Sequence, residues 1–178
     1  EDYLLDIISG NYAPAISKND ENDDPIPELV NLTKRNNDFN FGLRLSKLNG
    51  STYYSAEVVY DLASLTHRGW ILDSYIGKVH TIGNWDITYG IGHTWYSENT
   101  SNYFIGVKPE EVALGLTSYR TGAAYSLNFE ASVQYPLSES WVFEATITHS
   151  KLSNSISNSP LVVNDNITVS IVGFGYVF

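Results

Sequence analysis

The chain ends with Asp165-Asn-Ile-Thr-Val-Ser-Ile-Val-Gly-Phe-Gly-Tyr-Val-Phe178, a strand-forming sequence that stops on an aromatic residue. Two more aromatic residues, Phe174 and Tyr176, precede Phe178 at alternate positions. The end of a soluble chain usually frays, whereas here the last residue belongs to the predicted last strand. An unpaired sheet edge is costly in lipid, so a membrane barrel needs such a strand to pair with its first strand. We therefore interpret Phe174, Tyr176 and Phe178 as part of a closing strand.

Alternation of apolar and polar residues extends this interpretation to the rest of the chain. The clearest segment runs from Tyr119 to Tyr135, where one face is apolar with a tyrosine at each end and the other is small and polar. This period of two predicts a half-buried β-strand. The same pattern, or an apolar run of similar length, predicts further strands at 3–12, 39–46, 54–62, 70–81, 85–92, 141–148 and 165–178.

The connections between these strands fall into two classes. The short ones are Leu48–Ser51, which contains the strong hairpin signal Asn-Gly, and 66–68, 82–84 and 136–140. The long ones are 13–35, 98–118 and 153–164. Short turns at one end and long loops at the other are typical of outer-membrane barrels, although the brief connection 66–68 departs from this rule. The sequence therefore predicts a single domain over residues 1–178, an all-β antiparallel transmembrane β-barrel of about eight strands.

A soluble up-and-down barrel of the lipocalin type is the alternative, because its strands alternate in the same way. Its apolar face points inward and its polar face outward. Aromatic residues make up 13% of this chain and gather near the ends of the predicted strands, as in the girdles of membrane barrels. Charged residues make up 17%, which is less than a soluble exterior usually carries. Both observations favour the membrane barrel.

Composition argues against several other classes of protein. The formal net charge of −10 disfavours nucleic acid as a partner, because such binding depends on Lys and Arg. The absence of Cys excludes disulfides, thiol nucleophiles and cysteine metal sites, and we expect no cofactor. No apolar run approaches the ~20 residues of a membrane helix. The chain begins without Met or a secretory signal, which indicates a processed chain or a fragment.

The most specific signal lies in the loop Asn102-Tyr-Phe-Ile-Gly-Val-Lys-Pro-Glu-Glu-Val-Ala-Leu-Gly-Leu-Thr-Ser-Tyr119. It resembles Tyr-Phe-Gly-Val-Thr-Pro-x-x-Ala-x-x-Ser-Gly-Leu-x-x-Tyr, the signature of the MipA/OmpV family, which is named after MltA-interacting protein. The departures from this signature are the inserted Ile105 and Thr117, which replaces part of the usual Gly-Leu-Pro-x-Tyr. The likeness continues through 122–124, 137–141, 150–152, 159–162 and 173–178.

The resemblance implies a protein of the cell outer membrane, surrounded by outer-membrane lipid and without catalytic residues. Members of the family are described as scaffolds that bridge a lytic transglycosylase and a peptidoglycan synthase, and others as adhesion or antigen proteins. They are longer at the N-terminus, which leaves open whether the eight strands form a whole barrel or part of a larger, N-terminally truncated one. Murein-synthesis scaffolding is thus the first hypothesis. A permeability or transport barrel and a surface adhesin are the alternatives.

The loop that carries the signature also holds the first set of candidate functional residues. Lys108–Gly115 predicts a short helix, because Pro109 suits a first turn and glycine a helix end. We interpret the loop either as a partner-binding lid on the barrel mouth or as a packed loop that shapes the lumen. The residues concerned are Tyr103, Phe104, Val107, Pro109 and Tyr119.

Charged residues on the predicted lumen faces form the second set. They are either the selectivity lining of a pore or a pairing network that fills a narrow lumen, which is what an eight-stranded barrel leaves room for. These residues are Arg44, Glu57, Asp61, Asp86, Arg120, Glu130 and Glu144.

Two further patterns suggest chemistry only weakly. The acidic run Asn19–Asp24 offers oxygen ligands for Ca²⁺, but it lacks the glycine and the distal Glu of an EF-hand loop, so a solvated external loop is favoured. The four histidines show no spacing that requires a metal site or a catalytic triad, so we expect no enzymatic activity. They are His67, His80, His93 and His149.

Overall fold

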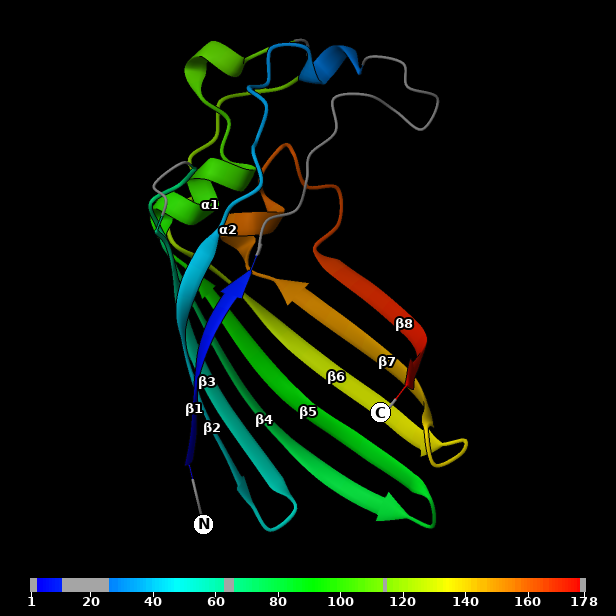
Figure 1. Cartoon of the computed structure of the whole chain (residues 1–178). Coiled ribbons are helices and arrows are strands. Elements are labelled where there is room, and N and C mark those ends of the chain that lie inside the picture. The colour runs from blue at the N-terminus through cyan, green and yellow to red at the C-terminus, as the bar shows by residue number, and fades with distance from the viewer. Residues whose placement is uncertain (1–2, 11–25, 63–65, 114, 177–178) are drawn as a thin grey trace.

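Eight antiparallel strands form one sheet in the order of the sequence (Figure 1). The structure is a computed structural model that describes residues 3–10, 26–62, 66–113 and 115–176. The strands are β1 (Tyr3–Gly10), β2 (Asn40–Asn49), β3 (Thr52–Asp61), β4 (Trp70–Ile82), β5 (Trp85–Tyr96), β6 (Ala124–Pro136), β7 (Trp141–Leu152) and β8 (Asn166–Tyr176). The predicted all-β antiparallel architecture of eight strands is thus confirmed.

Closure of the sheet into a barrel is not detected. Within the described residues β1 pairs only with β2, and β8 pairs only with β7, so that β1 and β8 form the two edges of a curled sheet (Figure 1). Tyr176 ends β8, whereas Phe178 and the acidic run Asn19–Asp24 lie outside the described residues. The expected pairing of the last strand with the first is therefore not observed in this part of the chain.

Two of the short turns place a glycine at the position where the backbone requires one. Asn49 pairs with Thr52 and Ile82 pairs with Trp85, so each turn has two central residues. Gly50 and Gly83, the first central residues, have φ values of 58° and 62°. A positive φ at the first central position is typical of a type II′ hairpin. The Asn-Gly signal thus located the first hairpin, but the asparagine is its last paired residue.

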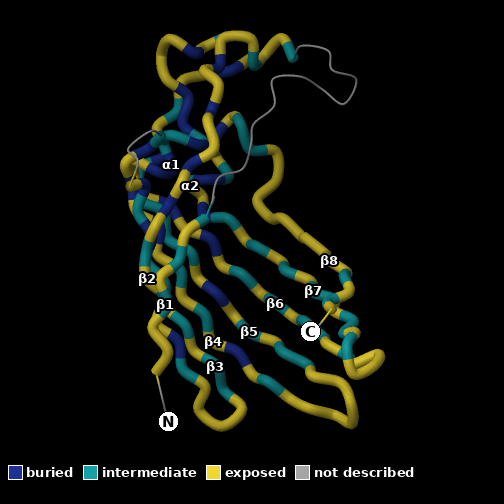
Figure 2. Tube along the Cα trace, viewed as in Figure 1, coloured by how far each residue is buried: buried dark blue, intermediate teal, exposed yellow. Residues whose placement is uncertain are grey.

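The register of the strands divides their side chains between two faces. Arg44 faces Glu57, and Glu57 faces Asp73 on the next strand, so these side chains share one face. This face is polar and includes most of the buried strand residues, so it is the concave face. The opposite, outer face carries exposed apolar residues from every strand, such as Leu43 on β2 and Ile91 on β5. The most buried residues gather at the loop end of the sheet, around the helices (Figure 2).

The edge strand β8 departs from this division. On the concave face, beside Thr148 of β7, this strand carries Ile167, Val169 and Ile171. These three side chains are about half exposed or more. The last strand is therefore apolar on the face that is polar in the central strands. This agrees with its sequence, which alternates poorly.

The long loops contain the helices. The longest helix, α1 (Glu98–Ile105), begins at Ser97, whose side-chain oxygen accepts a hydrogen bond from the N–H of Thr100, as an N-cap residue does. The shorter elements are η1 (Pro27–Leu29), η2 (Pro109–Glu111) and α2 (Asn154–Ser157). Within the described residues no helix is both long and apolar enough to cross a membrane.

The helix predicted for Lys108–Gly115 forms only as the single turn η2. Val112 is extended, and Gly115 has a φ of 79°. Ala113 forms an antiparallel bridge with Leu116, so the chain reverses direction instead of continuing the helix. The helix in this region is α1, which the sequence analysis had assigned to a loop.

The packing of Tyr75 gives a first testable prediction. Its ring lies over two glycines on the concave face, because a Cβ atom would lie 2.7 Å from the ring at Gly77 and 2.5 Å from it at Gly90. At Gly90 the same Cβ would also lie 2.4 Å from the backbone carbonyl oxygen of Ile76. Gly90→Ala should therefore destabilise the fold by about 1–3 kcal/mol, the usual effect of overpacking. Urea unfolding in detergent measures this. Gly173→Ala is the matched control, because a Cβ there meets nothing within 4 Å, and an equal effect of both changes would contradict the packing argument.

Candidate functional site

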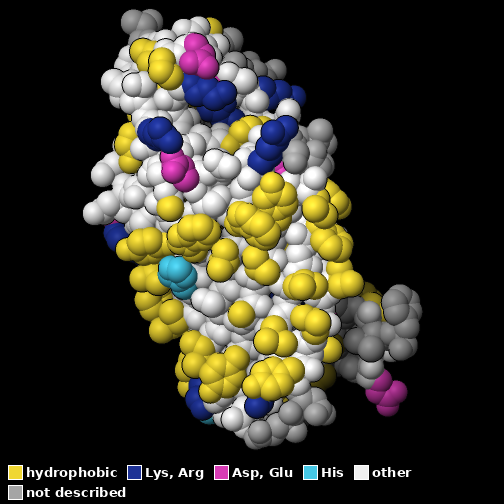
Figure 3. Space-filling view, turned by 90° about the vertical axis from the view of Figure 1, so that its left-hand side faces the viewer, with side chains coloured by type: hydrophobic (Ala, Val, Ile, Leu, Met, Phe, Trp, Pro, Cys, Tyr) yellow, Lys and Arg dark blue, Asp and Glu magenta, His cyan; other side chains and the backbone are white. Residues whose placement is uncertain are grey.

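Aromatic side chains form two groups on the outer face, one near each end of the strands. At the loop end Tyr60 packs on Trp70 with ring centroids 4.6 Å apart. At the turn end Trp85 packs on Tyr135 at 4.7 Å, and Trp141 packs on Tyr176 at 5.1 Å. Tyr and Trp at such positions are typical of the two interfaces of a membrane. Figure 3 shows apolar side chains covering the outer face between the loops and the turns.

The distance between these aromatic groups matches the thickness of an outer membrane. On β5, Trp85 and Trp95 lie near opposite ends of the strand and on the same face. Ten residues extend about 33 Å at 3.3 Å per residue. With the tilt of about 40° that is usual for barrel strands, this corresponds to about 25 Å across the membrane, the height of the apolar band of outer-membrane barrels.

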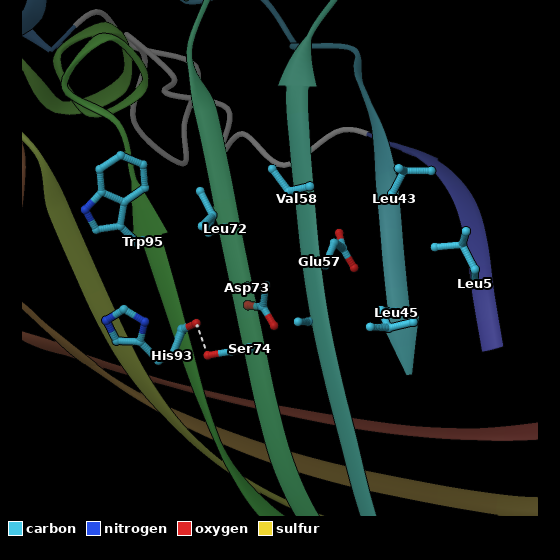
Figure 4. Close-up of a pocket in the computed structure, with 11 residues that line it drawn as sticks. Leu5, Leu43, Leu45, Glu57, Val58, Leu72, Asp73, Ser74, His93 and Trp95 are labelled. Carbon is cyan, nitrogen blue, oxygen red and sulfur yellow. Dashed lines mark hydrogen bonds between the residues drawn. The ribbon is translucent and has the colours of Figure 1, made fainter. Parts of the chain in front are cut away.

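A shallow depression of about 490 Å³ lies in the outer face between β1 and β5. Aliphatic side chains from neighbouring strands, including Leu5, Leu43 and Leu72, line most of it (Figure 4). Among the lining residues, the hydroxyl of Ser74 donates a hydrogen bond to the carbonyl of His93, and this bond is long at 3.4 Å. Such a largely aliphatic surface is suited to lipid chains.

A row of polar side chains crosses the concave face. Arg44 Nη2 lies 2.7 Å from Glu57 Oε2, and the two residues are opposite each other on β2 and β3. Farther along the row the Thr94 hydroxyl donates to Asp73 Oδ2 at 2.6 Å and accepts from Asn128 Nδ2 at 3.0 Å. These bonds extend over five strands. Asp73 also belongs to this row. It was not among the candidate residues, because the polar residues Ser74, Lys78 and His80 lie on the outer face of β4 and hide the alternation of that strand.

The other predicted lumen charges occupy three kinds of place. Glu130 and Glu144 lie on the concave face, where they accept hydrogen bonds from Thr148 at 3.4 Å and Gln134 at 3.1 Å. Asp86 lies at the turn end and accepts a 2.6 Å bond from Thr81. Asp61, at the loop end, is discussed below. The exception is Arg120, which is four residues before β6 in a loop.

Arg120 does not line the concave face. Its side chain is 81% exposed and forms an ion pair with Glu98 in the first turn of α1. The alternating pattern extends back to Tyr119 and therefore predicts a strand position for Arg120, but β6 begins only at Ala124. Gly122, with a φ of 68°, interrupts the strand conformation between them.

A folded cap covers the loop end of the sheet. We define this loop cap as α1, the described part of the loop 106–121 (106–113 and 115–121) and the segment 31–36. Its centre is the buried ion pair between Arg35 and Glu111, in which Nη1 lies 2.7 Å from Oε1 and Nη2 lies 2.9 Å from Oε2. Arg35 Nη2 also donates to the carbonyl of Gly106 at 3.1 Å. The two charged residues are 76 positions apart in the sequence, so this pair ties two separate loops together.

Glu111 is held by several donors at once. The N–H of Thr33 donates to Oε1 at 3.1 Å and the N–H of Lys108 donates to Oε2 at 2.9 Å. Burial raises the pKa of the Glu111 carboxyl, but the hydrogen bonds from Arg35, Lys108 and Thr33 outweigh burial and lower the pKa to about 2. The carboxylate is therefore charged at neutral pH, and its charge is matched by Arg35.

The predicted residues of the signature loop lie in this cap, at different depths. Phe104 and Val107 are buried, and Val107 forms an antiparallel bridge with Tyr119. Tyr103 is half-buried, and its hydroxyl accepts a 2.9 Å hydrogen bond from the N–H of Asn36. Pro109 is exposed. The contacts of Phe104 and Val107 favour a packed loop, whereas Pro109 remains available at the surface.

A polar cluster anchors the cap to the sheet. Asp61 Oδ2 accepts hydrogen bonds from the N–H groups of Thr66, His67 and Arg68 at 3.0–3.2 Å. The ring of His67 is buried, and its Nδ1 accepts from the N–H of Gly69 at 2.9 Å. Asp61 and His67 thus hold residues 66–69 in place before β4. Within the described residues no group of three or more His, Asp or Glu is arranged to hold a metal ion.

The apolar outer face, the polar concave face and the folded cap together define an antiparallel β-sheet protein whose outer surface is suited to lipid. The chain belongs to the family described as MltA-interacting protein MipA, whose sequence model matches residues 3–178. The resemblance drawn from the signature loop is thus confirmed. No solved structure shows a significant match to the chain.

Curated relatives agree with this assignment. MltA-interacting protein of Escherichia coli K12 is 29% identical over 144 residues, which are 76% of this chain and 58% of that protein. Outer membrane protein Omp26La of Vibrio anguillarum is 25% identical over 116 residues, and outer membrane protein OmpV of Vibrio cholerae is 24% identical over the same length. Each of these two matches covers 65% of this chain and 43% of the relative. The chain therefore spans about half the length of the curated relatives it matches, and it is a protein of the outer membrane.

Proposed function

We propose that the protein is a non-catalytic scaffold that holds a lytic transglycosylase at the periplasmic end of its sheet. The observation that carries this proposal is the family match over residues 3–178, together with the relative named MltA-interacting protein. A peptidoglycan synthase is the second partner that such a scaffold would bring to the transglycosylase. The contacts of the histidines support a non-catalytic role, since His67 is used in loop structure and His80 stacks on Tyr89.

The surface open to a periplasmic partner is small. The short turns mark the periplasmic end, since outer-membrane barrels have short turns on that side. The exposed aliphatic residues Leu48, Ile82 and Leu137 lie beside these turns. We call them the turn rim. A contact of this size fits a weak or transient complex, which is the class that buries less than about 1,200 Å².

Capture of a purified lytic transglycosylase by the detergent-solubilised protein tests the proposal. Leu137→Asp in the turn rim should reduce capture about tenfold, the effect of one contact worth about 1.4 kcal/mol. Val112→Asp is the matched control, because Val112 is exposed at the opposite, loop end. Capture no greater than that by an unrelated outer-membrane barrel would overturn the proposal.

A permeability barrel is the second candidate function, and the charged row on the concave face favours it. Arg44, Glu57 and Asp73 would line a polar path if further strands close the sheet around them. Conductance in planar bilayers tests this candidate. A conducting lumen should change its ion selectivity when Glu57 becomes Gln, and a trace that stays closed at all voltages would exclude it.

A further inference from the structure

A groove in the loop cap has no role in the functions proposed above. Its volume is about 550 Å³, and it lies between the loop after β3, the exposed side of α1 and the loop 106–121. Tyr103 and Tyr119 contribute aromatic surface, and Lys108 and Arg120 contribute positive charge. The groove is formed by loops beside the central strands and not by β1 or β8, so it does not depend on how the sheet closes.

The charge of the groove contrasts with that of the chain. The formal net charge is −10 for the whole sequence, yet no Asp or Glu is among the described residues that line the groove. Lys108 is exposed and forms no ion pair within the described part of the chain. Arg120 pairs with Glu98, but the Arg120 side chain is 81% exposed and that of Glu98 is 47% exposed, and such solvent-exposed pairs contribute little in water. Both cations are therefore available to an anion.

The groove lies at the level of lipid headgroups. It includes Thr66 and His67, which follow Tyr60 and precede Trp70 of the aromatic pair at the loop end of the outer face. Aromatic girdles lie at the boundary between acyl chains and headgroups. Figure 3 shows Lys and Arg side chains among the loops above the apolar band. A molecule in the groove would be in register with the headgroups of the outer leaflet, because the long loops face outward.

We propose that this groove binds the phosphorylated headgroup of an outer-leaflet glycolipid. Lys and Arg are the side chains that recognise phosphate, Arg through several N–H donors in one plane and Lys as a compact charge. The faces of Tyr103 and Tyr119 offer apolar surface to sugar rings. The acyl chains of the same lipid would lie on the apolar outer face directly below, so one molecule would satisfy both surfaces.

Binding of lipid A with two phosphates to the full chain in zwitterionic micelles tests the inference. The variant Lys108→Ala with Arg120→Ala should bind at least tenfold more weakly, since each cation near an anionic surface contributes about 1 kcal/mol. The matched control is Lys47→Ala with Lys78→Ala, which removes the same charge from the turn end and should bind as the unchanged protein does. The mobility shift of the folded protein on unheated gels shows that each variant has folded.

The form of the ligand is tested with two further probes. Lipid A without phosphates should bind as weakly as the double variant does, and inorganic phosphate should not compete at millimolar concentration. Equal binding of lipid A to the unchanged protein and to the double variant would overturn the inference. So would equal binding of lipid A with and without phosphates, and competition by inorganic phosphate would show a free-anion site instead of a lipid site.

Discussion

Replacing Glu111 by Gln should destabilise the folded loop cap by about 3–5 kcal/mol, because the change leaves the buried guanidinium of Arg35 without its charge partner. The other donors to this carboxylate, the N–H groups of Thr33 and Lys108, would lose an ionised acceptor at the same time. The segment 31–36 and the loop 106–121 would then separate. Limited proteolysis measures the local opening free energy, since cleavage reports the population of the open loops.

A double-mutant cycle separates the ion pair from other effects of the substitutions. Arg35→Leu with Glu111→Leu should be less destabilising than the sum of the single changes, because no buried charge then remains unpaired. Arg120→Ala is the control, since it removes an exposed ion pair and should change stability by no more than about 1 kcal/mol. Equal effects of Arg120→Ala and Glu111→Gln would show that burial does not strengthen the pair.

The same carboxylate predicts how the cap responds to acid. In the folded protein the pKa of Glu111 is about 2, below its ordinary value of 4.5. A lowered pKa means that the carboxylate stabilises the cap fully above pH 4.5 and loses this contribution as the pH falls from 4.5 towards 2. Cleavage of the cap by pepsin should therefore rise steeply between pH 4 and pH 2. Glu111→Gln should abolish most of that rise, because glutamine does not titrate.

The cap also shows where the sequence could not predict the site. Arg35 and Glu111 carry the buried ion pair, but neither was among the candidate residues, because nothing in a local pattern connects two loops so far apart in the chain. The helix α1 was missed for a different reason. Its start is marked by Ser97 followed by Glu98, but its own sequence is mostly polar and lacks the apolar period by which helices are recognised.

The sheet was more accessible to prediction, because alternation has a direct physical cause. Successive side chains of a strand point to opposite faces, so a strand between lipid and a polar interior must alternate. The clean alternation of β2 and β3 therefore located both strands and the partners Arg44 and Glu57. The method failed where a strand departs from that environment. β8 lies at an edge of the sheet and is apolar on its concave side. Its sequence therefore predicts a strand, but it does not predict which part of a protein packs against that side.

The direction of the two faces can be tested on neighbouring residues of β7. Ile147 lies on the outer face near the middle of the strand and is 49% exposed, whereas Thr148 lies on the concave face beside Glu130. Ile147→Arg should destabilise the membrane-inserted protein by about 2–4 kcal/mol, the cost of an Arg at the bilayer midplane. Thr148→Arg should be nearly neutral, because the new guanidinium can pair with the Glu130 carboxylate. Urea unfolding from lipid vesicles measures both.

This comparison also decides whether lipid or water surrounds the outer face. The two substitutions add the same side chain at adjacent positions, so strand propensity and depth in the membrane are matched. If water surrounded the outer face, Ile147 would be an ordinary surface position that accepts Arg, and the order of the two effects would disappear or reverse. A larger loss for Thr148→Arg than for Ile147→Arg would therefore contradict a lipid-facing outer surface. A larger loss for Ile147→Arg, present in vesicles and reduced in a detergent micelle that adapts around the charge, would identify lipid as the solvent of that face.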